Sequence, residues 1–205
     1  MNYDILISFA LATIALAISP GPDNIYVLVQ SISNGKSYGM ATVCGLIAGC
    51  LIHTTLLAFG VSAIIAANED LFFGIKLLGA IYLLYLAFKV YRSDGQLNLE
   101  SNVAPKKSLT GLFVQGFFMN VLNPKVTIFF LAFFPGFLFS DTLSHVIQFY
   151  ILGGLFMLVS FLVFSSIALL AGNIKTYVVK HNNSGMVLKW LQIVVFVGIA
   201  IFILI

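Results

Sequence analysis

The chain has few of the residues on which most soluble functions depend. Only 8% of its 205 residues are charged and 60% are hydrophobic, whereas about a quarter of a typical soluble domain is charged. Its ten basic residues are spread along the sequence, so they do not form the basic face that a nucleic-acid-binding surface needs. The composition therefore argues against a nucleic-acid partner and predicts an all-α polytopic membrane protein that contacts lipid.

Metal ligands and reactive thiols are also scarce. The chain has two cysteines and three histidines, with neither an H-E-x-x-H motif nor a C-x-x-C pair. Cys44 and Cys50 lie in one apolar segment, and a spacing of six residues on a helix points them in different directions, so we expect no disulfide between them. Because no zinc-type ligand cluster is present either, we expect no enzymatic activity, no bound metal and no cofactor.

Long apolar segments dominate the remaining sequence. Crossing the hydrocarbon core of a bilayer takes about 20 apolar residues. The segments long enough are residues 4–30, 38–67, 71–91, 109–134, 145–172 and 186–205. The first begins beside Asp4 and lacks the positive charge that opens a signal peptide, so we interpret it as a retained span. The sequence predicts one transmembrane domain over residues 1–205.

The connections between these segments alternate in charge. Lysine and arginine occur in the loops at residues 31–37, 92–108 and 173–185, whereas the loops at 68–70 and 135–144 are acidic. Basic loops of membrane proteins face the cytoplasm. We therefore predict that these three loops are cytoplasmic and that both termini lie outside.

The longest polar loop, at residues 92–107, divides the chain into two halves of three spans, about 1–95 and 105–205. Three is odd, so the second half enters the membrane from the opposite side, as an inverted repeat. Each half opens with a span that proline interrupts: Ser19-Pro20-Gly21-Pro22 in span one and Asn123-Pro124 in span four. Interrupted spans in corresponding positions of two halves indicate the binding site of a transporter.

The two breaks carry opposite charges, Asp23 and Lys125. Ser19 and Asn123 are the expected N-caps, each followed by proline at the first helical position. A lysine at a helix start opposes the helix dipole, which favours an anionic partner. An amino-acid zwitterion fits, with its carboxylate at Lys125 and its ammonium at Asp23 and at carbonyls freed by the break. The alternative is that Asp23 and Lys125 pair with each other to make their burial tolerable.

Further polar residues near the breaks complete the candidate site. Asn24 and Asn120 join Asp23, Asn123 and Lys125 as predicted substrate-binding residues. His53, in the second span, joins Asp23 as a candidate proton relay; the alternative is a hydrogen-bonded histidine in the packed interior. A small-xxx-small pattern from Gly45 to Gly49 allows close helix packing, either inside the chain or in a homodimer.

The sequences at both breaks resemble those of the LysE/RhtB family of amino-acid exporters. The similar motifs are Ser19-Pro20-Gly21-Pro22-Asp23, Asn123-Pro124-Lys125 and the run KLLGAIYLLYL at residues 76–86. The likeness covers the whole chain in length, order and spacing. It implies export of amino acids or their derivatives across the cytoplasmic (inner) membrane of a bacterium, driven by a proton or ion gradient.

Two other functions compete with this interpretation. An exporter of metal cations or of another small solute has a similar architecture, but a metal exporter needs more carboxylates, imidazoles or thiols inside the membrane. A non-transporting membrane scaffold has no need of two broken spans with opposite charges. Transport of a small-molecule substrate therefore explains more of the sequence than either alternative does.

Overall fold

The computed structural model describes residues 2–94, 107–181 and 184–204. This part of the chain contains helices and turns and no β-strand, which confirms the predicted all-α class. The helices are α1 (Tyr3–Ile18), α2 (Pro22–Asn34), α3 (Lys36–Leu56), α4 (Ser62–Ala67), α5 (Glu69–Tyr91), α6 (Leu109–Val121), α7 (Pro124–Ile128), α8 (His145–Leu169), α9 (Ala171–Lys180) and α10 (Ser184–Leu204). Wider π-helical turns, η1 (Leu57–Val61) and η2 (Phe129–Phe133), continue α3 and α7, and the 3-10 turn η3 (Phe134–Phe137) follows η2.

Four helical segments of the described chain are long and apolar enough to cross a membrane, and the number is six if each of two bent pairs is one span. The straight spans are Lys36–Ile65, Asp70–Tyr91, α8 and α10. The bent pairs are α1 with α2, at 60°, and α6 with Pro124–Phe137, at 49°. The predicted interruptions of spans one and four are thus confirmed, because the helix axis changes direction at each proline-containing break.

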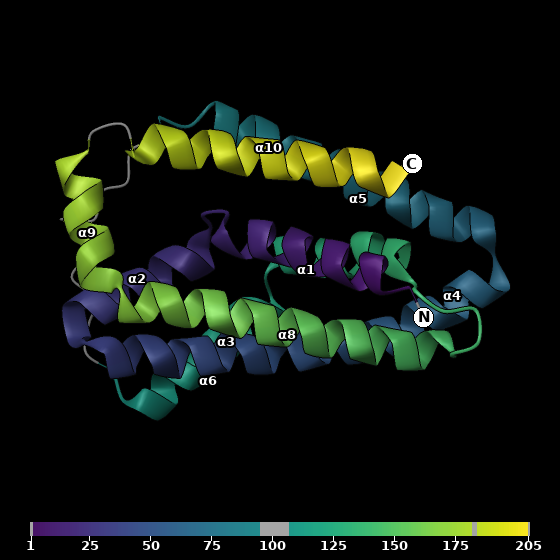
Figure 1. The fold of residues 1–205 in the computed structure, drawn as a ribbon, viewed down its shortest axis with the longest axis horizontal. Coiled ribbons are helices and arrows are strands. Elements are labelled where there is room, and N and C mark those ends of the chain that lie inside the picture. The colour runs from purple at the N-terminus through teal and green to yellow at the C-terminus, as the bar shows by residue number, and fades with distance from the viewer. Residues whose placement is uncertain (1, 95–106, 182–183, 205) are drawn as a thin grey trace.

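The spans run along the long axis of the molecule, and both termini lie at the same end (Figure 1). An even number of spans requires this arrangement. The second spans of the two halves, α3 and α8, pack on each other, and so do the third spans, α5 and α10. Both pairings are compatible with a two-fold relation between the halves, and the inverted repeat stays a prediction. The loop predicted to divide the halves lies largely outside the described residues.

The central span is α3, which packs against α2, α6 and α8. In its most apolar stretch, 50% of the residues are buried, compared with 22% in α5 and in α10. A Cβ on Gly45 would overlap the carbonyl oxygen of Phe113, and one on Gly116 would overlap that of Thr42. The motif from Gly45 to Gly49 therefore packs against α6 inside the chain. Because the motif is used inside the chain, it gives no support to the predicted homodimer, which stays a prediction.

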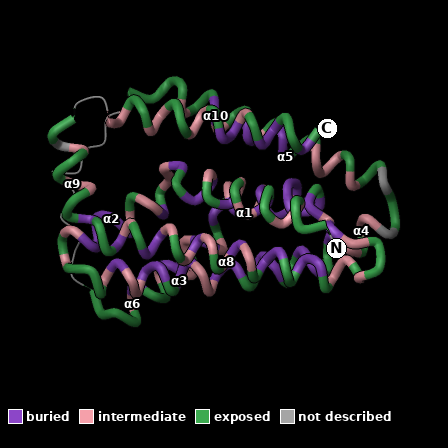
Figure 2. Tube along the Cα trace, viewed as in Figure 1, coloured by how far each residue is buried: buried purple, intermediate pink, exposed green. Residues whose placement is uncertain are grey.

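Helices α5 and α10 form a pair along one side of the bundle, and much of their outward surface is exposed (Figure 2). Large apolar side chains cover that surface: Leu77, Leu78, Ile81 and Leu84 on α5, and Val187, Val194 and Ile201 on α10. Such a surface is unsuited to water but matches lipid chains. Burial thus separates a polar, tightly packed interior around α3 from a lipid-facing rim.

One helix of the structure was not predicted. Residues 173–185 were expected to be a loop after a span ending at residue 172, but α8 ends at Leu169 and α9 follows. In α9, Ile174 and Val178 pack with Leu28 and Ile32 of α2, while Lys180 is exposed. The segment is a short amphipathic helix, too polar to be recognised as a span. It lies crosswise at the end of the molecule remote from the termini (Figure 1).

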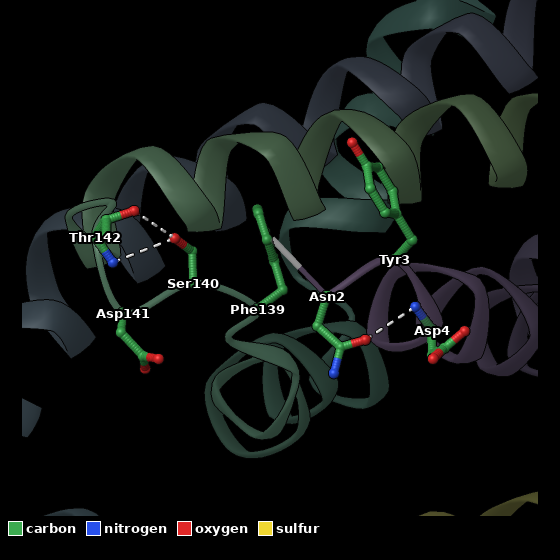
Figure 3. A pocket seen from close by; sticks show the side chains of 7 residues that line it. All are labelled: Asn2, Tyr3, Asp4, Phe139, Ser140, Asp141 and Thr142. Carbon is green, nitrogen blue, oxygen red and sulfur yellow. Dashed lines mark hydrogen bonds between the residues drawn. The ribbon is translucent and has the colours of Figure 1, made fainter.

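An open pocket of about 580 Å³ lies at the end that carries the termini, between the start of α1 and the turn before α8. Buried Gln148 of α8 shapes this turn, because its Oε1 accepts the N–H groups of Phe139 (2.8 Å) and Ser140 (3.0 Å). The carboxylates of Asp4 and Asp141 lie at opposite ends of the pocket (Figure 3). The pocket shares no lining residue with the cavity at the breaks.

Candidate functional site

At the first break the chain becomes extended between two helices. Helix α1 ends at Ile18, and the N–H of Ser19 still donates to the carbonyl of Ala15 at 3.1 Å. The predicted cap at Ser19 with Pro20 as the first helical residue is wrong: Gly21 is the N-cap, and α2 begins at Pro22. A residue that precedes proline is disfavoured in the helical conformation, so Gly21 is extended (φ −157°, ψ 177°).

The second break has the predicted cap. Asn123 precedes α7, with Pro124 as the first helical residue, and its side-chain Oδ1 accepts the backbone N–H of Lys125 at 3.0 Å. An asparagine in this place satisfies a donor that the helix itself leaves unpaired. Because this cap fixes the backbone at Lys125, it also fixes where the lysine side chain starts.

Two polar contacts join the breaks across the interior. Asn123 Nδ2 donates to Asp23 Oδ2 at 2.8 Å, and both side chains are buried. Lys125 Nζ donates to the carbonyl oxygen of Ser19 at 3.4 Å and lies 5.2 Å from the ring centroid of Phe196 on α10. The two breaks therefore meet inside the bundle, as their charges predicted.

Asp23 and Lys125 do not form an ion pair. Among the described residues, no carboxylate oxygen comes within 4.0 Å of Lys125 Nζ. The second carboxylate oxygen of Asp23, Oδ1, is buried and has no hydrogen-bond partner there. The structure thus lacks the direct pairing that was the alternative explanation of the two charges, and it leaves a buried carboxylate oxygen available to a donor.

Two carbonyls at the breaks already have hydrogen-bond partners. Asn24 Nδ2 donates to the carbonyl of Ala17 at 2.6 Å. The carbonyl of Asn120 accepts the N–H of Asn123 at 3.0 Å and lies 3.1 Å from His53 Nε2. These two carbonyls thus already have partners, and binding of a substrate ammonium at the breaks stays a prediction. Asp23 Oδ1 is a buried acceptor without a partner among the described residues.

A small cavity lies between the breaks, and all five predicted substrate-binding residues line it: Asp23, Asn24, Asn120, Asn123 and Lys125. Its volume of about 30 Å³ suits a water molecule and is too small for an amino acid, so binding of a larger solute requires the helices to move apart. A Cβ on Gly21 would lie 3.7 Å from Lys125 Nζ, an ordinary contact, so the approach of the lysine does not itself require glycine there.

Sequence reasoning missed the part of the cavity wall that spans two and five supply. Cys50 of α3 and Phe156, Ser160 and Phe164 of α8 also line it. Ser160 carried a signal, because it is a polar residue inside an apolar run. Nothing local indicated that it faces the breaks, since that depends on how α8 packs against α1 and α3.

His53 lies beside the site and does not line the cavity. It is buried, its Nε2 contacts the carbonyl of Asn120, and its ring centroid is 5.3 Å from that of Phe130. These contacts account for its burial by packing and hydrogen bonding. A role in proton transfer with Asp23 stays a prediction. In the described part of the chain no three His, Cys, Asp or Glu side chains are grouped as metal ligands.

A cavity lined by charged and amide side chains between two broken spans of an apolar helical bundle is the kind of site found in membrane transporters. The chain belongs to the LysE type translocator family, whose family model matches residues 14–205. It is therefore a multi-pass membrane transporter and not an enzyme.

Individual relatives cover most of the chain. It is 29% identical over 178 residues to the homoserine/homoserine lactone efflux proteins of Salmonella typhi and Salmonella typhimurium, covering 87% of this chain and 85% of each relative. It is 28% identical over 186 residues to an uncharacterized membrane protein of Vibrio cholerae, covering 89% of this chain and 88% of the relative. No solved structure matches the chain.

Proposed function

We propose that the protein exports amino acids or their derivatives across the cytoplasmic membrane of a bacterium and binds the zwitterion between Asp23 and Lys125. The observation that carries the proposal is that these opposite charges line one cavity without pairing. Asp23 Oδ1 has no partner. Lys125 has three N–H donors and a single hydrogen-bond contact of 3.4 Å, to Ser19.

The energetic argument is that isolated charges inside a membrane protein are costly. A charged residue at the middle of a span costs about 3 kcal/mol on insertion scales, and a buried charge without its partner is strongly destabilising. A ligand carrying one carboxylate and one ammonium neutralises both groups at once. The Salmonella relatives are named for efflux of homoserine and its lactone, which supports a substrate that carries an α-amino group.

Asp23 also offers a route to coupling. Its free oxygen accepts either a proton or the substrate ammonium, and the two compete for one position. Exchange of one for the other across the membrane is then proton-coupled export, in which a proton entering the cell displaces the substrate. Alternating access would expose the cavity to each membrane face in turn.

The direct test is export from cells that overproduce the protein. Cells are loaded with a panel of radiolabelled amino acids, and efflux is compared with that from cells producing Lys125→Met at equal membrane abundance. We expect faster efflux of at least one small amino acid with the unaltered protein and background efflux with the variant. Background efflux of the whole panel by the unaltered protein would exclude amino-acid export.

We further propose that the end with the termini is outside the cell. The basic residues of α9 lie at the opposite end (Figure 1), and basic segments face the cytoplasm. With Cys44 and Cys50 replaced by alanine, Thr142→Cys before α8 should react with a membrane-impermeant maleimide in intact cells. Thr176→Cys on α9 should react only after the membrane is opened, and the reverse pattern would invert the topology.

A further inference from the structure

Helix α8 contributes a wall of the cavity that belongs to neither break. Phe156, Ser160 and Phe164 are spaced four residues apart and therefore share one helix face, and all three line the cavity. The wall presents two aromatic rings with one hydroxyl between them. It faces a cavity whose charged groups, Asp23 and Lys125, come from other helices.

Buried hydroxyls of the bundle differ in their hydrogen bonding, and within the described part of the chain that of Ser160 is unpaired, as are those of Ser19 and Ser165. In Thr13, Ser31 and Thr54 the hydroxyl donates to the carbonyl four residues earlier, at 2.8, 2.8 and 2.9 Å. This is the common way for Ser and Thr to satisfy themselves in a helix. Ser160 is 2% exposed and its Oγ has no hydrogen-bond partner among the described residues.

Cys50 is the other polar side chain that lines the cavity outside the breaks, as far as the described residues show. Its Sγ already contacts the carbonyl of Leu46 at 3.5 Å and Asn120 Oδ1 at 3.7 Å. Ser160 is therefore the group on this wall with its hydrogen-bonding capacity unused. A buried polar atom left unpaired calls for an explanation, and a ligand in the adjoining cavity supplies one.

We infer that Ser160 determines substrate specificity by hydrogen-bonding a hydroxyl on the substrate side chain, whose methylene groups lie between Phe156 and Phe164. The inference rests on the proposed function. Asp23 and Lys125 bind the ammonium and carboxylate that all amino acids share, so they do not distinguish one side chain from another. The wall of α8 makes that distinction and favours short hydroxylated side chains over apolar ones of the same length.

The test uses two amino acids that differ in one hydroxyl. Efflux of 2-amino-4-hydroxybutyrate and of 2-aminobutyrate is measured for the full-length protein in proteoliposomes, and the ratio of the two rates is compared between variants. Ser160→Ala should lower the ratio about fivefold, the effect of one neutral hydrogen bond. The loss should fall on the hydroxylated substrate, because the alanine still fits beside the two phenylalanines.

Ser165→Ala is the matched control. Ser165 is on the same helix, is buried and also has an unpartnered hydroxyl among the described residues, yet it does not line the cavity. Its replacement should leave the ratio unchanged. Ser160→Thr, which keeps a hydroxyl, should retain most of the ratio and provides the comparison if the alanine variant is poorly folded.

The outcomes separate this inference from the proposed function. If the unaltered protein exports both substrates and Ser160→Ala keeps its ratio, or slows both equally, Ser160 has no role in specificity and amino-acid export stands. The same conclusion follows if Ser165→Ala changes the ratio as much as Ser160→Ala does. If the unaltered protein exports neither substrate nor any other amino acid, the proposed function is refuted and this inference with it.

Discussion

The two broken spans perform the same geometric task with different chemistry. At the first break a glycine caps α2 without a side-chain hydrogen bond, and Asn24 turns back to satisfy a carbonyl of its own break. At the second break Asn123 uses both ends of its carboxamide, one on the N–H of Lys125 and the other on Asp23. The carboxamide of Asn123 therefore contacts both breaks, whereas that of Asn24 stays within its own.

This asymmetry explains why the charges are held apart. Asn123 donates a hydrogen bond to one oxygen of Asp23, and the ammonium of Lys125 donates one to the carbonyl of Ser19. Each charge is oriented by a neutral group from the opposite break and keeps capacity for a further partner. A neutral orienting group avoids the tight ion pair that a substrate would otherwise have to disrupt, and the following variants test this interpretation.

The largest effect is expected for Lys125→Met, which keeps most of the side-chain volume and removes the charge. Loss of a buried charged partner costs binding about 2–5 kcal/mol, so export should fall by about 30-fold or more. Efflux of labelled substrate from proteoliposomes measures this, with size-exclusion chromatography as the check on folding.

A second variant shows whether the lysine serves Asp23 or the substrate. If Lys125 only neutralised Asp23, adding Asp23→Asn to Lys125→Met would restore export. Since the two side chains do not pair in the structure, we expect the double variant to be as inactive as the single one. Recovery of export in the double variant would show that Lys125 serves to neutralise Asp23 and does not bind the substrate.

Asp23→Asn alone should have the next largest effect. The variant retains an oxygen that can accept the hydrogen bond of Asn123 but loses the negative charge that binds the ammonium, and a charge-assisted hydrogen bond contributes about 1.5–3 kcal/mol. Export should fall about 10- to 100-fold. The remaining export should no longer respond to an imposed pH gradient, because the exchangeable proton site is gone.

The pH response is measured in proteoliposomes with and without an inward proton gradient. The control is the unaltered protein, whose export should accelerate when protons flow toward the cytoplasmic face. If Asp23→Asn shows the same acceleration, Asp23 is not the coupling group and His53 is the next candidate.

Variants of Asn123 distinguish the stability that the helix cap contributes from the stability that the contact between the breaks contributes. Asn123→Ala removes both hydrogen bonds, and we expect a loss of stability of about 2–4 kcal/mol from the cap and from the unpaired buried acceptor. Asn123→Ser keeps a good cap but is too short to reach Asp23, so it should lose about half as much. Thermal unfolding in detergent compares the two, and an unchanged stability of Asn123→Ser would show that the contact with Asp23 adds nothing to stability.

The smallest effect is expected for Asn24→Ala, because the amide of Asn24 serves only its own break. Loss of its hydrogen bond to the carbonyl of Ala17 should cost about 1 kcal/mol of stability. The same unfolding measurement applies. A loss as large as that for Asn123→Ala would mean that both breaks organise each other equally and would remove the asymmetry.

Much of this arrangement could be predicted because its causes are local. The length of the apolar segments determines the spans, and proline interrupts a helix whatever surrounds it. A charge beside each break, inside an apolar run, indicated a polar interior. The five predicted binding residues line one cavity for these reasons. Even the error at Ser19 had a local cause, since Gly21 precedes Pro22 and is disfavoured in the helical conformation.

Tertiary structure decided the features whose causes lie far apart in the sequence. The contact of Asn123 with Asp23 joins residues 100 positions apart, and it determines that one carboxylate oxygen stays free. Helix α9 forms on α2, and Ser160 lines the cavity because α8 packs beside the first break and α3. The local sequence determines where a helix breaks and which charge it carries, whereas packing determines which side chain satisfies each buried polar group and which remains free for a ligand.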